Sequence, residues 1–99
     1  MARFRVYELK SSDVIALDLQ ADLVELLPTR VMAPLYPITT MTWSFSRLNP
    51  RFVIDGQTYS MATQRMSSVD QRDIGREVAN LSSRSDDITA ALDFLFQGF

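Results

Sequence analysis

The dipeptide Asp55-Gly56 restricts the fold of this chain more than any other short motif. Apolar and β-branched residues occupy much of positions 51–54 and 57–62 on either side of it. Asp-Gly readily supplies the positive φ angles that a type I′ turn requires. The motif therefore predicts a β-hairpin, in which the two flanking segments are antiparallel neighbours, and it points to a chain built largely from antiparallel strands.

Three segments before this hairpin have the pattern of short strands. Phe4 and Val6 alternate with polar neighbours, which predicts a strand with one buried face. Residues 14–19 are apolar and β-branched, and we expect them to form a more buried strand that pairs with the first as a hairpin. Residues 31–35 form a third apolar run, but Pro34 and Pro37 should restrict it to an edge, a bulge or a strand end.

The remaining segments outside the C-terminal region have weaker patterns. Residues 23–27 are apolar except for Glu25 and stop before Pro28, so we expect an exposed connection or edge segment. Residues 67–79 are polar and mixed, and we expect them to cover the sheet edge. Residues 38–49 are ambiguous; an alternating strand that runs into a turn at Asn49-Pro50 would contain Met41, Trp43, Phe45 and Leu48.

The only clear helical pattern lies near the C-terminus. Ser83 or Ser85 is the expected N-cap, and Asp86 and Asp87 follow in the first turn, where they complement the helix dipole. Gly98 stands where a C-cap glycine belongs. The apolar residues recur with helical spacing at Ile88, Ala91, Leu92 and Leu95. The sequence therefore predicts one mainly β domain over residues 1–99 with a C-terminal helix.

Composition removes much of the chemistry that a protein can perform. The 99 residues contain no Cys and no His, which excludes disulfides, a thiolate nucleophile and an imidazole base. Asp70, Asp73 and Glu77 have a spacing that could hold a cation on a helix, but the arginines between them favour a solvated charged face. We therefore assign no catalytic residue, no metal site and no cofactor. Scattered arginines and a net charge of −2 argue weakly against tight nucleic-acid binding, and without a membrane span or secretory signal we expect a cytoplasmic protein.

The last six residues are unusually apolar for a chain terminus. They include four large apolar side chains, Phe94, Leu95, Phe96 and Phe99. One helix face can bury Leu95 with Ile88 and Leu92, but it cannot also bury all three phenylalanines. Either a homodimer interface or an aromatic tail that inserts into a partner would account for this surface, and both could hold.

Read as a whole, the sequence resembles the CcdB family of plasmid and chromosomal toxins. The resemblance is carried by residues 3–7 (Arg-Phe-Arg-Val-Tyr), residues 17–23 (Leu-Asp-Leu-Gln-Ala-Asp-Leu), residues 30–35 (Arg-Val-Met-Ala-Pro-Leu), and a closing run that comprises residues 66–69, 74–82 and 96–99. It implies the small bent antiparallel β-barrel or sheet of the CcdB/MazF toxin superfamily. A short three-stranded wing, the C-terminal helix and a homodimer complete the fold that the resemblance implies.

The resemblance also implies a function without catalysis by the chain itself. Family members bind the A subunit of DNA gyrase and trap the complex in which DNA is cleaved. Carried over by position, the gyrase-binding residues would be Phe96, Gln97, Gly98 and Phe99, flanked by Asp22, Leu23 and Val24. Family members often have Trp where this chain has Gln97, and an aliphatic residue where it has Phe99.

A second implied partner is a CcdA-like antitoxin, whose disordered C-terminal segment folds across the toxin dimer. Its expected contacts are Leu23, Leu26, Leu27 and Arg30. Operator DNA would be contacted only through the antitoxin. Two alternatives stay open. A MazF-type endoribonuclease shares the fold but usually has a Gly-Asp-aliphatic motif and an Arg-Pro pair, which this chain lacks. An attenuated CcdB homologue that binds only its antitoxin is the other.

Overall fold

The computed structural model describes residues 2–24, 26–41 and 43–99, and within these ranges the chain forms seven β-strands, four short 3₁₀ helices and one α-helix. The strands are β1 (Arg5–Leu9), β2 (Ile15–Asp18), β3 (Thr29–Pro37), β4 (Arg51–Ile54), β5 (Gln57–Met61), β6 (Ser67–Asp70) and β7 (Ile74–Asn80). The 3₁₀ helices are η1 (Asp22–Val24), η2 (Thr63–Arg65), η3 (Gln71–Asp73) and η4 (Ser82–Arg84), and the α-helix is α1 (Ser85–Gln97).

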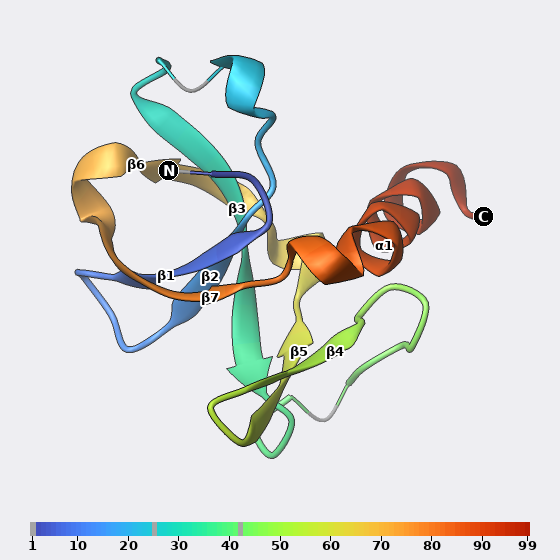
Figure 1. Cartoon of the computed structure of the whole chain (residues 1–99). Coiled ribbons are helices and arrows are strands. Elements are labelled where there is room, and N and C mark those ends of the chain that lie inside the picture. Colours follow the sequence, from blue (N-terminus) through green and yellow to red (C-terminus); the bar gives the residue numbers. More distant parts are fainter. Residues whose placement is uncertain (1, 25, 42) are drawn as a thin grey trace.

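All seven strands join one antiparallel sheet in the order β4-β5-β3-β2-β1-β7, with β6 also paired to β3. Figure 1 shows the sheet bent, with α1 on one side of it and the β4–β5 hairpin projecting below. The β4–β5 hairpin and the C-terminal end of β3 make the three-stranded wing. Asp55 and Gly56 join β4 to β5 with φ angles of 51° and 79°, so the predicted Asp-Gly hairpin is confirmed.

Strand β3 is the centre of the sheet, so its expected place at a sheet edge is wrong, although Pro37 does lie at the end of the strand. One of its edges pairs with β2, while the other pairs with β6 over residues 29–32 and with β5 over residues 35–37. Pro34 lies where the partner changes from β6 to β5, and its carbonyl accepts a hydrogen bond from the Ala62 amide at 2.9 Å. Its missing N–H therefore interrupts no ladder, which explains how a central strand accommodates this proline.

Apolar side chains cover both faces of the sheet. The larger cluster, on the face that packs against α1 and the wing, is centred on Val6, Leu17, Leu35, Phe52 and Ile88. The smaller cluster lies within the curve of the sheet and consists of Tyr7, Ala16, Met32 and Ile74. The expectation that the first strand buries one face only is wrong, because β1 places Val6 and Tyr7 in different clusters. The hairpin of β1 and β2 is confirmed.

Two weakly patterned segments differ from expectation. Residues 67–79 do not simply cover the sheet edge, since they form β6, η3 and most of β7, and β7 pairs with β1. The described part of residues 38–49 contains no strand, although Met41 is buried. Its backbone is turned instead, with the Leu48 and Asn49 amides both donating to the Phe45 carbonyl.

Helix α1 follows its predicted apolar face and its predicted end but not its predicted start. Arg84 occupies the N-cap position without a side-chain hydrogen bond, so neither Ser83 nor Ser85 is the N-cap. Gly98 is left-handed, with a φ of 81°, and its amide donates to the Phe94 carbonyl, which confirms the predicted C-cap.

Candidate interaction surfaces

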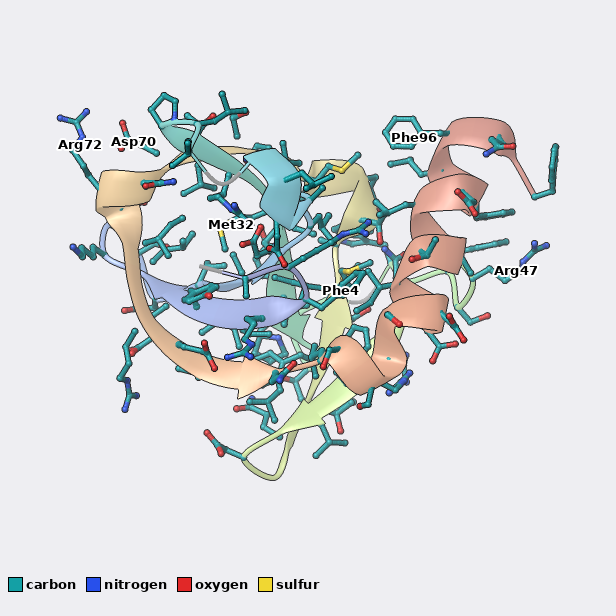
Figure 2. All side chains as sticks on the ribbon, turned by 45° about the horizontal axis from the view of Figure 1, so that its top comes forward. Phe4, Met32, Arg47, Asp70, Arg72 and Phe96 are labelled. Carbon is teal, nitrogen blue, oxygen red and sulfur yellow. The ribbon has the colours of Figure 1, made fainter. Side chains whose placement is uncertain are left out.

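The C-terminal end of α1 carries aromatic side chains that the chain does not cover. Ile88 and Ala91 on the inner face of the helix are fully buried, whereas Phe96 and Phe99 are 70% and 75% exposed. Figure 2 shows Phe96 projecting from the side of the helix. Gly98 then turns the chain out of the helical path. The predicted tail of residues 96–99 is therefore an exposed aromatic surface, called the tail here.

The loop before β4 braces the end of α1 that carries the tail, because it packs on Phe94 in the last turn of the helix. The ring of Phe45 stacks on Phe94, with centroids 5.4 Å apart and planes at 3°. The guanidinium of Arg47 lies 4.6 Å from the centroid of the same Phe94 ring. Together these contacts fix the last turn of α1 against the loop. Sequence reasoning missed this brace, because no local pattern links an aromatic residue in a loop to one helix side chain.

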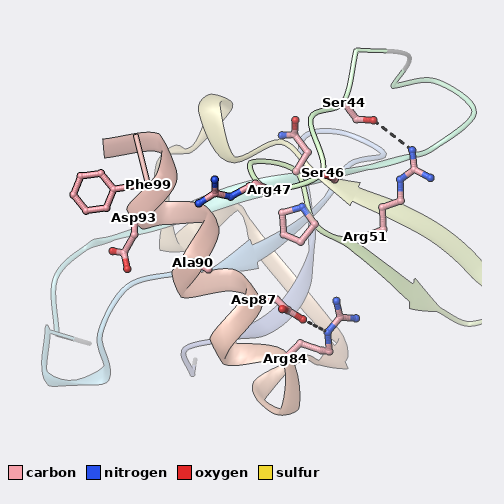
Figure 3. Close-up of a pocket in the computed structure, with 11 residues that line it drawn as sticks. Ser44, Ser46, Arg47, Arg51, Arg84, Asp87, Ala90, Asp93 and Phe99 are labelled. Carbon is pink, nitrogen blue, oxygen red and sulfur yellow. Dashed lines mark hydrogen bonds and ion pairs between the residues drawn. The ribbon is translucent and has the colours of Figure 1, made fainter. Parts of the chain in front are cut away.

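An open groove runs between this loop and the outer face of α1, with a volume of about 880 Å³ (Figure 3). Arg84 donates to Asp87 at 2.7 Å, and Arg51 donates to the Ser44 hydroxyl at 3.4 Å. The groove is therefore lined by charges of both signs, and it ends beside the tail at Phe99. Its lining residues are Ser44, Ser46, Arg47, Asn49, Pro50, Arg51, Arg84, Asp87, Ala90, Asp93 and Phe99.

A second apolar surface surrounds η1. Leu23 and Leu26 are 98% and 95% exposed and Leu27 is half exposed, and these three residues are called the leucine ridge here. This confirms an exposed connection at residues 23–27, apart from Glu25 and the side chain of Val24, which lie outside the described residues. Asp22 anchors the N-terminal end of η1, since its Oδ1 accepts a hydrogen bond from the Arg3 amide at 2.9 Å.

Arg30, expected as an antitoxin contact, is buried beneath this region and offers no surface to a partner. Its Nη2 lies 2.6 Å from Asp18 Oδ2, and neither side chain has any exposed area. Arg30 Nη2 also donates to the Gln20 carbonyl at 3.1 Å and lies 3.7 Å from Asp22 Oδ1. Arg30 therefore holds the backbone that leads into η1, and the direct contact is corrected to an indirect, supporting role.

Burial raises the pKa of the Asp18 carboxyl, although hydrogen bonds from Arg30 and the Gln20 amide oppose the shift. Arg30 Nη1 is buried without a hydrogen-bond partner among the described residues. An ionised pair in this position is costly to desolvate. The Asp18–Arg30 pair lies where the backbone leaves β2 for η1, which indicates that the pair fixes the direction of that segment.

The tail and the leucine ridge are separate within the chain. In Figures 1 and 2, the short sky-blue coil of η1 stands apart from the C-terminal end of α1. Asp22 and Leu23 therefore do not flank the tail of their own chain. The described residues bring no three Asp or Glu side chains together in a metal-binding group, and none of their helices is long and apolar enough to cross a membrane.

The geometry presents two exposed apolar surfaces on a small bent sheet, and comparison with protein families agrees with this architecture. A family model described as CcdB protein matches residues 3–98 of the 99-residue chain. The match includes the whole sheet, η1 and α1.

Proposed function

Because the chain belongs to the CcdB family, whose members are toxins of toxin–antitoxin systems, we propose that it binds the A subunit of DNA gyrase and traps the DNA-cleaved complex. The observation that carries this proposal is the exposed tail, with Phe96 and Phe99 uncovered at the end of a braced helix. Large apolar side chains left in water are typical of surfaces that a partner buries. Inhibition would then come from occupying a cleft and not from chemistry on a substrate.

Each residue of the tail would contribute in a different way. Phe96 and Phe99 would supply most of the apolar area, and aromatic anchors commonly dominate binding energy at interfaces. Gln97 would hydrogen-bond to the target, since its side chain both donates and accepts. The left-handed Gly98 turns the chain so that Phe99 leaves the helix direction. Phe94, held by Phe45, would keep the helix end from fraying when the target is met.

A homodimer is part of the proposal. Within one protomer η1 lies apart from the tail (Figure 1), so Asp22, Leu23 and Val24 can flank a tail only if it belongs to a second copy. Pairing of two tails on one face would also create a larger apolar surface than one chain presents. Sedimentation of the purified protein at micromolar concentration should therefore give twice the mass of the chain, and a monomer would contradict this step.

We place the antitoxin on the leucine ridge. Leu23, Leu26 and Leu27 present a row of aliphatic side chains that a disordered segment could cover as it folds. Arg30 would act indirectly, because its buried side chain holds the backbone that leads into η1. Operator DNA would be reached only through the antitoxin.

The deciding experiment is a DNA cleavage and supercoiling assay with purified gyrase. The full chain should raise the amount of cleaved DNA, and a chain that ends at Phe96 should lose this effect. Val53→Ala is the matched control, because Val53 is an exposed apolar residue on β4, away from the tail. Circular dichroism of each protein checks that the sheet and helix are intact. Equal activity of the full and shortened chains would remove the tail from the mechanism.

Gln97 favours a second candidate function, an attenuated toxin that binds only its antitoxin. Glutamine cannot stack on a guanidinium as an aromatic ring does, although it can hydrogen-bond to one. Expression without antitoxin in a gyrase-sensitive host separates the two candidates. Growth arrest would support gyrase trapping, whereas normal growth with retained antitoxin binding would support the attenuated form.

A further inference from the structure

The concave face of the sheet carries a groove that neither proposed partner uses. Residues 32, 34 and 36 alternate along β3, and Met32, Pro34 and Tyr36 line the same cavity of about 300 Å³. Figure 2 shows Met32 inside the curve of the sheet. The rest of the cavity wall comes from the β1–β2 hairpin, η2 and β6, and consists of Leu9, Ser12, Val14, Ala16, Arg65, Ser67 and Val69.

A second cavity adjoins this one. It has a volume of about 240 Å³ and is lined by Tyr36, Thr40, Met41, Trp43 and Arg65. Both cavities share Tyr36 and Arg65, so they are neighbours on the surface, and the two together are called the concave groove here. Its combined size falls in the range of sites that hold a small ligand or a few side chains.

The groove has an apolar half and a single positive charge. Leu9, Val14, Met32 and Val69 form the apolar half. Arg65 is the one charged residue in the described lining of either cavity, and its guanidinium has no hydrogen bond or ion pair with any residue that the structure describes. Its guanidinium carbon lies 4.9 Å from the Trp43 ring centroid and 5.9 Å from that of Tyr36. Two aromatic rings thus hold an unpaired cation at one end of an apolar channel.

We propose that the concave groove binds an extended peptide segment of a partner protein, with aliphatic side chains on the apolar half and a carboxylate on Arg65. The groove floor from Met32 to Tyr36 spans about 13 Å, the length of about four extended residues. A carboxylate matches the planar fork of a guanidinium and forms charge-assisted hydrogen bonds with it. The aliphatic side chains would fill the cavity beside Met32 and Val69, both of which line it.

A nucleic acid fits the groove less well. Aromatic rings beside an arginine can stack with a base, but backbone phosphates require several cations along their path. The described lining offers only Arg65. A peptide with one acidic residue balances that charge, so charge complementarity favours it. None of the residues that line the groove belongs to the tail, and the inference does not depend on gyrase binding.

Trp43 provides the readout, since it is the only tryptophan of the chain and lines the groove. The probes are an acetylated pentapeptide with aliphatic residues at positions 1 and 3 and glutamate at position 5, its glutamine twin, and a thymidine oligonucleotide. The glutamate peptide should change Trp43 fluorescence saturably and bind at least tenfold more tightly than the glutamine peptide. The Arg65→Gln variant should bind both peptides equally.

Arg72→Gln is the matched control, because Arg72 is an exposed arginine that pairs with Asp70 away from the groove. It should keep the tenfold preference. If Arg65→Gln does not fold, as judged by circular dichroism, Arg65→Lys replaces it and should reduce the preference, because lysine keeps the charge and loses the fork. Equal binding of the two peptides to the unmodified protein, no saturable change, or Arg65-dependent binding of the oligonucleotide alone would overturn the proposal.

Discussion

The buried pair of Asp18 and Arg30 makes a sharp prediction about stability. In Asp18→Asn the shape is nearly kept but the carboxylate charge is lost, which leaves the fully buried Arg30 guanidinium with only the exposed carboxylate of Asp22, 3.7 Å away, as a counter-charge. Breaking such a pair from one side typically costs about 3–5 kcal/mol. A domain of this size is stable by only about 5–15 kcal/mol. We therefore expect Asp18→Asn to remove a large part of the free energy of unfolding.

The opposite variant, Arg30→Met, should behave differently with pH. Without Arg30, burial raises the pKa of Asp18 further above 3.8, the ordinary value for an aspartate. A carboxyl whose folded pKa is raised binds protons more readily when folded, so its contribution to stability is present below about pH 3.8 and is lost as pH rises through the folded pKa. Arg30→Met should thus recover stability on acidification. Asp18→Asn should not, because a guanidinium stays charged at any such pH.

Urea unfolding followed by circular dichroism at pH 7 and pH 5 measures these differences. All proteins should be compared at one concentration, since the stability of the proposed dimer would depend on it. The double variant Asp18→Leu with Arg30→Met should be more stable than Asp18→Asn, because it buries no charge. The reasoning would be refuted if Asp18→Asn lowered the free energy of unfolding by less than about 1 kcal/mol. It would also be refuted if the double variant were no more stable than Asp18→Asn.

Three further predictions test smaller features. Phe45→Ala removes the stack on Phe94 and should lower the free energy of unfolding by about 1 kcal/mol or more in urea, whereas an unchanged value would show that the ring stack adds nothing. Gly98→Ala has open space for its methyl group but must adopt a positive φ, so thermal unfolding should show a loss of about 1–2 kcal/mol, and no loss would mean that the helix end rearranges freely. Asp70 should titrate in an NMR experiment with a pKa of about 2, because hydrogen bonds from Arg72 favour its charged form. The stability that results is present above pH 3.8 and is lost as the pH falls through about 2. Arg72→Gln should move the pKa of Asp70 back towards 3.8, and an unchanged pKa would show that Arg72 is not the cause.

Features that depend on neighbours in sequence were predictable. The turn at Asp55-Gly56 and the end of α1 at Gly98 follow from backbone preferences of single residues, and the structure places both as expected. The exposure of Leu23 and Leu26 follows from an apolar run too short and too interrupted to form a buried element. These signals need no knowledge of the rest of the chain.

Features that depend on distant partners were not predictable in the same way. Pro34 is acceptable in a central strand only because β3 exchanges β6 for β5 at that point. Arg30 was expected on the surface, since its buried partner Asp18 is twelve residues earlier and nothing local links them. Phe45 lies in a segment whose sequence pattern was ambiguous, and its role is set by a ring on α1.

The position of Pro34 has a consequence during synthesis on the ribosome. Strand β3 can pair with β2 as soon as it is synthesised, because β2 precedes it in the chain. Its other edge has no partner until β5 and β6 have been synthesised. A nascent chain then displays an unpaired strand edge, which other unfinished chains could join. Pro34 faces that edge, as its hydrogen bond with Ala62 shows, and has no N–H to offer a neighbouring chain. The same residue that marks the exchange of partners thus protects the open edge from pairing with other chains until the correct strands arrive.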